Sequence, residues 1–143
     1  MSRVLICREA IEDSVLGNLA LARAFVQSGG EACVVFTGEA LRALDTGTFE
    51  WSRNFKTREV QAAVVGAAEQ AGLPLAHREL DGRWSDVRAF VRSVQAESGV
   101  RLIACPIFAA LLDLGPGVDH LERITESELV DLLQNADTVM GGY

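Results

Sequence analysis

Apolar residues along this chain occur in two spacings: short unbroken runs, and stripes that recur every three or four positions. Unbroken runs are typical of strands buried on both faces in a parallel sheet, and stripes are typical of helices packed on one side. The runs predict strands at 3–7, 32–36 and 100–104, a weaker one at 75–80 and a terminal one at 138–140. The stripes, bounded by caps or glycines, predict helices at 12–28, 39–44, 57–71, 84–98, 106–114 and 126–134, the last capped by Thr125. The segment 118–124 fits either a further strand or a structured loop.

Strands that alternate with helices of this length predict an α/β fold. The expected architecture is a three-layer sandwich around a mostly parallel sheet of four to five strands, joined by right-handed crossovers. The chain has 143 residues, of which 49% are apolar, and this is enough for one core, so a single domain spanning 1–143 is expected. In such sheets ligands bind outside the carboxyl ends of the strands. Residues that directly follow a predicted strand are therefore the first functional candidates.

The charge balance excludes several classes of partner. With 20 acidic and 13 basic residues the net charge is −7, whereas a nucleic-acid surface needs clustered cations. The longest apolar stretch, 102–112, contains a proline and is shorter than the roughly 20 residues that span a bilayer, so no membrane association is predicted. Glu9 closes the first apolar run before a signal-peptide core could form, so a cytoplasmic protein with reduced thiols is expected.

Sequence motifs for common cofactor chemistry are missing. The chain has no Gly-x-Gly-x-x-Gly, no phosphate-binding Gly-Lys-Ser/Thr loop and no Gly-x-Ser-x-Gly elbow. Its three cysteines, Cys7, Cys33 and Cys105, form no Cys-x-x-Cys pair and have no zinc-type spacing. No bound cofactor or metal is therefore expected, and each thiol is considered individually.

Cys33 lies at the start of the predicted strand 32–36, at the opposite edge from the strand ends, and is expected to be a core residue. Cys105 has the most informative position of the three thiols. It follows the predicted strand 100–104 and precedes Pro106, which opens a helix. The unpaired amides of Ile107 and Phe108 at the start of that helix would favour a thiolate, which is the reactive form in sulfur and redox chemistry. The alternative is that Cys105 is a small core residue, because free cysteines are among the most buried side chains. The sequence leaves both interpretations open.

Several other side chains are candidate helpers. Arg8 and Arg53 would add positive charge if they lie over the same edge of the sheet, although each also fits a solvated surface arginine. Cys7 would exchange sulfur with Cys105 if their strands were neighbours, and burial beneath the first crossover is the competing prediction. His120 is the better of the two histidines for proton transfer, ahead of His77, provided that it lies near Cys105.

The segment 45–56 is irregular, and loops of this length are often functional. Its aromatic residues, Phe49, Trp51 and Phe55, would either bind a partner or pack the loop onto the core or a neighbouring subunit. This segment supports an alternative function: a non-catalytic oligomeric α/β module that binds a small ligand or a protein through the 45–56 loop.

Three stretches of the chain resemble the DsrE/DsrF-like family of sulfur-relay proteins, which includes YchN-like and TusD-like members. They are Cys33-Val34-Val35-Phe36-Thr37-Gly38-Glu39-Ala40, Gly99-Val100-Arg101-Leu102-Ile103-Ala104-Cys105-Pro106 and the closing segment 129–139. The resemblance implies a flavodoxin-like sandwich that forms dimers, trimers or hexamers. It also implies a sulfur-carrying cysteine, which by position is Cys105, and protein donors and acceptors of sulfur. The leading hypothesis is therefore a small cytosolic sulfur carrier or sulfurtransferase-like protein that holds sulfane sulfur as a persulfide.

Overall fold

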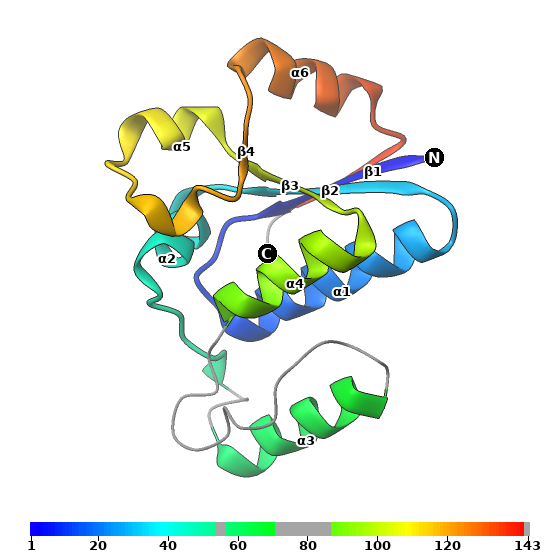
Figure 1. Cartoon of the computed structure of the whole chain (residues 1–143), viewed down its shortest axis with the longest axis vertical. Coiled ribbons are helices and arrows are strands. Elements are labelled where there is room, and N and C mark those ends of the chain that lie inside the picture. Colours follow the sequence, from blue (N-terminus) through cyan, green and yellow to red (C-terminus); the bar gives the residue numbers. More distant parts are fainter. Residues whose placement is uncertain (54–56, 71–86, 142–143) are drawn as a thin grey trace.

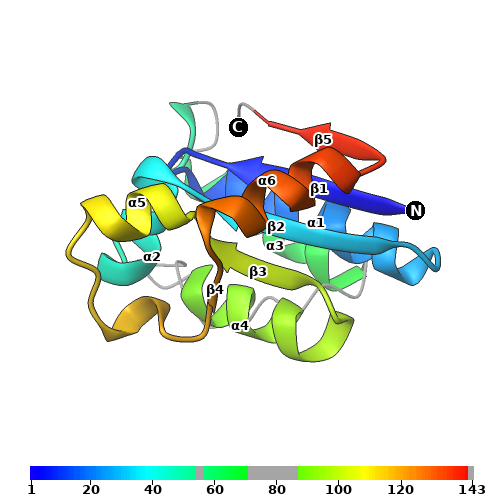
Figure 2. The same ribbon diagram turned by 90° about the horizontal axis from the view of Figure 1, so that it is seen from above.

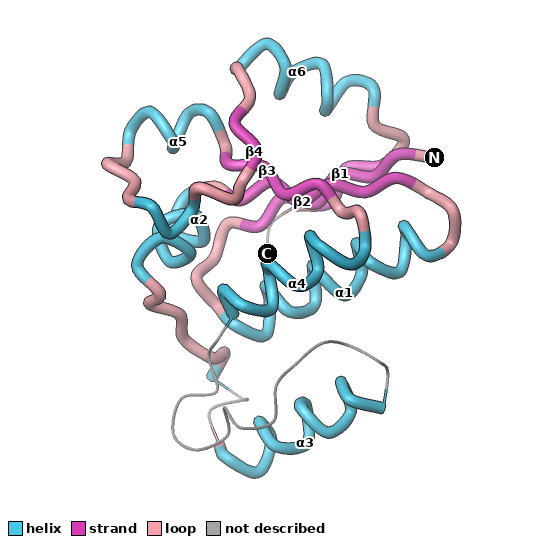
Figure 3. Tube along the Cα trace, in the orientation of Figure 1, coloured by secondary structure: helices cyan, strands magenta, loops and turns pink. Residues whose placement is uncertain are grey.

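The computed structural model describes residues 1–53, 57–70 and 87–141. These residues form a five-stranded, all-parallel sheet with helices on both faces (Figures 1 and 3). The strands are β1 Ser2–Cys7, β2 Glu31–Phe36, β3 Arg101–Ala104, β4 Glu122–Arg123 and β5 Thr138–Met140. The helices are α1 Glu12–Gln27, α2 Gly38–Thr46, α3 Arg58–Gln70, α4 Val87–Ser98, α5 Pro106–Leu111 and α6 Glu126–Asn135. The predicted flavodoxin-like three-layer α/β sandwich is confirmed.

The strand order across the sheet is β4-β3-β2-β1-β5. As in flavodoxin, one strand lies on the far side of β1 and the rest continue on the other side. Here, however, the strand beyond β1 is the last in the chain, and α6 carries the chain back across the sheet from β4 to reach it (Figure 2). β2 is therefore the central strand, between β1 and β3.

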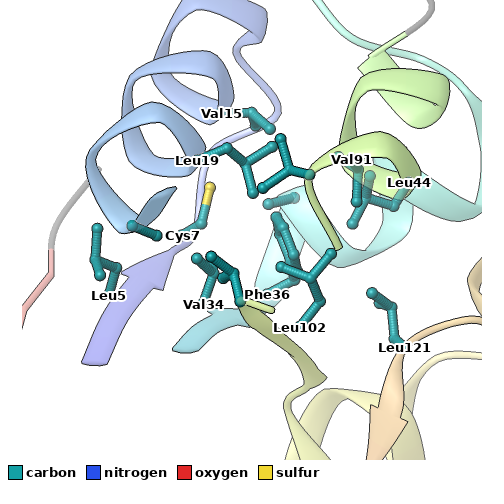
Figure 4. Close-up of a cluster of buried hydrophobic side chains, with 14 of the residues drawn as sticks. Leu5, Cys7, Val15, Leu19, Val34, Phe36, Leu44, Val91, Leu102 and Leu121 are labelled. Atoms are coloured by element: carbon teal, nitrogen blue, oxygen red, sulfur yellow. The ribbon is translucent and has the colours of Figure 1, made fainter. Parts of the chain in front are cut away.

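Side chains that alternate along the strands form two apolar clusters, one on each face of the sheet. The α1-side cluster includes Leu5, Val34, Phe36 and Leu102 and packs against α1, α2 and α4 (Figure 4). The α6-side cluster consists of Val4, Cys33, Val35, Ile103 and Cys105, covered mainly by leucines of α6. The sequence predicts both faces as buried, and the parity of each position decides which layer a side chain meets.

Most predicted elements appear at the expected places, with differences at two ends. The helix predicted for 106–114 ends at Leu111, because Leu112 is extended and the Gly115 amide donates to Asp45 Oδ2 at 2.8 Å. α2 is longer than the predicted 39–44 and continues to Thr46, where Gly47 ends it with a φ of 80°. A contact with a distant segment therefore accompanies the end of α5, whereas a local glycine ends α2.

The structure confirms the predicted start of α6. The Thr125 side chain accepts from the Glu128 amide at 3.1 Å, and the Glu128 side chain accepts from the Thr125 amide at 3.3 Å, which completes a capping box. The predicted strand 75–80 with His77, and the beginning of the predicted helix 84–98, lie outside the described residues. Within the described ranges no helix is long and apolar enough to cross a bilayer.

Candidate functional site

The carboxyl ends of β1, β2 and β3 lie side by side, so the residues that follow these strands share one edge of the sheet. The Cys105 amide donates to the Phe36 carbonyl at 2.9 Å, and the Thr37 amide donates to the Cys7 carbonyl at 3.0 Å. The chain leaves β2 toward the α1 side, through α2, and leaves β3 toward the α6 side, through α5 (Figure 1). Neighbouring strands that exit to opposite faces create a crevice outside their carboxyl ends, and in α/β proteins such crevices bind ligands. Here the crevice lies between Thr37 and Cys105.

An open hollow of about 520 Å³ marks this crevice. Its lining residues come from the ends of β1 and β2, the start of α2 and one position of α5: Arg8, Glu9, Thr37, Gly38, Glu39 and Phe108. Arg8 is exposed, as the sequence allowed, and its carbonyl accepts from the Ala40 amide at 3.1 Å. The hollow contacts α5 through Phe108, whose side chain also packs against the cluster that contains Cys105.

Cys105 lies beneath this surface rather than on it. Its residue is 6% exposed, and its side chain belongs to the α6-side cluster, where Phe108, Ile124 and Leu129 are among the covering residues. It occupies the N-cap position of α5, with Pro106 in the first turn, but its side chain accepts no capping hydrogen bond. The expected contact between the sulfur and the amides of Ile107 and Phe108 is therefore not formed in this conformation.

One part of the cover over Cys105, the Phe108 side chain, belongs to the short helix α5. α5 has six residues, none of them fully buried, and Ile107 and Leu111 direct apolar side chains to the solvent. A short helix that buries little apolar area has a low free energy of local opening. Displacement of α5 or of the Phe108 side chain would therefore remove one part of the cover over the cluster that contains Cys105.

Cys7 lies on the opposite face of the sheet, which corrects its expected role as a sulfur-exchange partner. Its side chain belongs to the α1-side cluster and points toward α1 (Figure 4), and β2 separates its strand from β3. Burial raises the pKa of the Cys7 thiol to about 12, against a smaller opposing effect of the hydrogen bond with Asn18. The competing prediction, burial beneath the first crossover, is the correct one.

The buried Cys7 thiol predicts a loss of stability at alkaline pH. From about pH 9 upward the unfolded chain releases this proton, whereas the folded chain retains it until about pH 12, so the free energy of unfolding falls as the pH rises. Urea denaturation at pH values between about 9 and 12 should show that the free energy of unfolding falls less steeply with pH for Cys7→Ala than for the wild type. Val15→Ala, which removes a buried apolar group without a titratable one, is the control for general destabilisation and should keep the wild-type slope. Equal slopes for Cys7→Ala and the wild type would contradict the prediction.

Cys33 lies at the start of β2, at the amino edge of the sheet, as predicted. It faces the same layer as Cys105 but lies at the opposite end of the strands. It lines a hollow of about 310 Å³ together with Arg3 and Arg101. Burial raises its pKa to about 11, despite the opposing effect of Arg101, so Cys33 has little thiolate at neutral pH.

His120 lies away from Cys105, which corrects its candidate role in proton transfer. Its carbonyl accepts from Gln95 of α4 at 3.1 Å, and the neighbouring Leu121 belongs to the α1-side cluster, across the sheet from Cys105. Burial, and then Arg92 of α4, lower the pKa of its imidazole, with Asp119 opposing them. His120 is therefore a largely neutral side chain beside α4.

Acidic side chains accompany Arg8 at this edge, and both candidate arginines are exposed. Arg8 lies next to Glu9 and Glu39, and these two glutamates line a second hollow with Glu50. Arg53 is exposed on the segment that follows Trp51. Among the described residues no group of three histidine, cysteine or acidic side chains could hold a metal ion.

The 45–56 segment packs onto the core where it is described, which agrees with the second of the two uses predicted for its aromatic residues. Trp51 is only 8% exposed within the α1-side cluster, and Phe49 packs against the same cluster. Glu50 pairs with Ile11, and the Glu50 amide donates to the Ala10 carbonyl at 3.0 Å. Phe55 lies outside the described residues. The aromatic side chains that are described therefore fix this segment to the start of α1.

The sequence interpretation missed five residues that cover the α6-side cluster, which contains Cys105. They are Ile124 and the α6 residues Leu129, Leu132, Leu133 and Ala136. Their spacing reveals an amphipathic helix, but no local signal shows that its apolar face meets the strand that carries Cys105. That contact depends on the return of α6 across the sheet.

Comparison with known proteins supports the fold. No protein-family model matches the chain, and no curated protein matches it. Among solved structures, the crystal structure of the YchN protein from E. coli is similar over 99% of this chain and 100% of that one, with a TM-score of 0.55 and 16% sequence identity. At this identity the similarity establishes the fold alone. The chain thus has the fold of YchN, a DsrE/DsrF-like protein, and the resemblance inferred from its sequence is confirmed at the level of the fold.

Proposed function

We propose that this chain is a small cytosolic sulfur carrier that accepts sulfane sulfur as a persulfide on Cys105. One observation carries the proposal: Cys105 is the thiol that follows β3 at the carboxyl edge of the sheet on the α6 side, at the start of a six-residue helix that buries none of its residues fully. Cys7 and Cys33 have pKa values raised by burial, which disfavours their thiolates. The resemblance to sulfur-relay proteins supports the same assignment. It also implies a homo-oligomeric working form, a dimer, trimer or hexamer, in which the chain acts as the carrier subunit of a sulfurtransferase system.

The proposed step is a thiol–persulfide exchange. The Cys105 thiolate attacks the outer sulfur of a donor persulfide, a new S–S bond forms at Cys105, and the S–S bond of the donor breaks. The donor leaves as a thiolate and takes up a proton, so sulfane sulfur moves without net oxidation. Transfer to an acceptor thiolate repeats the exchange in the opposite sense. Both events require the outer sulfur to reach solvent, and hence a displaced α5.

Intact mass spectrometry after incubation with a persulfide donor tests this proposal. The wild type should gain about 32 Da, one sulfur atom, and Cys105→Ser should gain nothing. Cys33→Ala is the matched control, because Cys33 faces the same layer as Cys105 at the other end of the strands, and it should load like the wild type. Equal sulfur uptake by Cys105→Ser and the wild type would refute the assignment.

A further inference from the structure

The negative charge of this chain is concentrated on the part that covers Cys105. Residues 106–143 contain seven acidic residues and one arginine, a net charge of −6, whereas residues 1–105 contain thirteen acidic and twelve basic residues, a net charge of −1. The acidic residues are Asp113, Asp119, Glu122, Glu126, Glu128, Asp131 and Asp137. α5 and α6 therefore belong to a strongly acidic segment, whereas acidic and basic residues nearly cancel in the rest of the chain.

The acidic side chains of α6 point outward. α6 buries Leu129 and Leu133 against the sheet, and Glu126, Glu128 and Asp131 are exposed. The helix contains no basic residue. Among the described residues of this segment, Glu122 pairs with Arg101 at 2.7 Å. The exposed carboxylates of Glu126 and Asp131 face the solvent, where an external cation can reach them.

Exposed apolar side chains accompany these acids. Ile107 and Leu111 of α5 are 48% and 71% exposed and lie one helical turn apart, and Val130 of α6 is 50% exposed. α5 and α6 contact each other on the same face of the sheet (Figures 1 and 2). Their outer surface, the α5/α6 face, thus combines apolar side chains with carboxylates, a composition that suits a protein partner of opposite charge.

We propose that the α5/α6 face is the docking surface for a basic protein that exchanges sulfur with Cys105, an inference that rests on the proposed function. Lysine or arginine side chains of this partner meet Glu126 and Asp131, and its apolar side chains cover Ile107, Leu111 and Val130. Docking on α5 displaces Phe108 and opens the route to the sulfur. The negative charge of the α5/α6 face repels small anionic sulfur compounds. A second copy of this chain is disfavoured on this face, because a two-fold pairing would bring the acidic segments together.

Binding can be measured independently of sulfur chemistry. We use the Cys105→Ser variant and two labelled peptides that differ only in charge, one with lysines between leucines and one with glutamates at the same positions. Fluorescence anisotropy should show the lysine peptide binding at least about tenfold more tightly at low salt, with the difference shrinking as the ionic strength rises. Asp131→Lys should weaken lysine-peptide binding about fivefold, whereas Glu59→Lys, the same charge change at an exposed position of α3, should leave it unchanged.

The outcomes separate this inference from the proposed function. Equal binding of the two peptides, or equal effects of Asp131→Lys and Glu59→Lys, overturns the docking proposal even if Cys105 accepts sulfur. Sedimentation of Leu111→Glu gives a further check. An assembly smaller than that of the wild type also overturns the docking proposal, because the α5/α6 face would then bind a second copy of the chain. If the lysine peptide binds as expected but no donor ever loads Cys105, the docking surface stands and the sulfur-carrier function fails.

Discussion

Replacing Phe108 with alanine should raise the alkylation rate of Cys105 at least about tenfold. Phe108 lines the hollow at the carboxyl edge and also packs onto the cluster that contains Cys105, so its removal joins the hollow to the buried sulfur. It also weakens the attachment of α5, which lowers the free energy of local opening. Time-resolved iodoacetamide labelling followed by peptide mass mapping gives the rate for each cysteine separately.

The controls for this experiment lie within the same helix and the same molecule. Leu111→Ala removes an apolar side chain of α5 that is mostly exposed, and it should leave the Cys105 rate near the wild-type value. Cys7 and Cys33 should stay unreactive in both variants, because burial in the core raises their pKa values. Accelerated labelling of all three thiols would mean that Phe108→Ala unfolds the protein globally. No change at Cys105 would show that Phe108 does not guard it.

Gly117→Ala should destabilise the protein by about 2–3 kcal/mol. A Cβ at Gly117 would lie 2.5 Å from the Asp45 carbonyl oxygen and 3.0 Å from the Asp45 Cα, so backbone must move to admit it. Asp45 also accepts the Gly115 amide, and this contact holds the segment after α5 against the end of α2. The substitution therefore loosens the anchor that ends α5, as well as straining the turn Pro116–Val118.

Gly17→Ala is the matched control for this prediction. Gly17 lies inside α1 with no atom within 4 Å of an added Cβ, so alanine should stabilise the helix by about 0.5–1 kcal/mol. The urea midpoint should therefore fall below that of the wild type for Gly117→Ala and rise above it for Gly17→Ala. Similar midpoints for Gly117→Ala and the wild type would show that the Asp45 contact is not maintained in solution.

Local patterns were sufficient to predict most of the described elements. Unbroken apolar runs of four or five residues, at 4–7, 32–36 and 102–105, identify β1, β2 and β3. The spacing of apolar positions identifies α1 and α6, and Thr125 marks the start of α6. The alternation of strand and helix then leads to a parallel sheet, because a parallel neighbour requires a crossover connection. The same logic placed Cys105 at the carboxyl edge and Cys33 at the amino edge.

Contacts between distant segments decided the functional details. The end of α5 depends on Asp45, about 70 positions earlier in the chain, and the irregular segment after α2 is fixed by backbone pairing with Ile11. A local pattern contains neither partner. The two uses of Trp51 stayed open in the sequence for the same reason, since an aromatic residue in a polar stretch gives no sign of the α1-side cluster that buries it.

The sequence by itself determined which residues form strands and helices and which thiol follows β3, because periodicity and capping are local properties of the chain. Only the tertiary structure decided that Cys7 and His120 lie on the α1 side while Cys105 faces α6. The face that a strand residue meets depends on strand order and on the layer to which each crossover returns, and these are set by packing among segments far apart in the sequence.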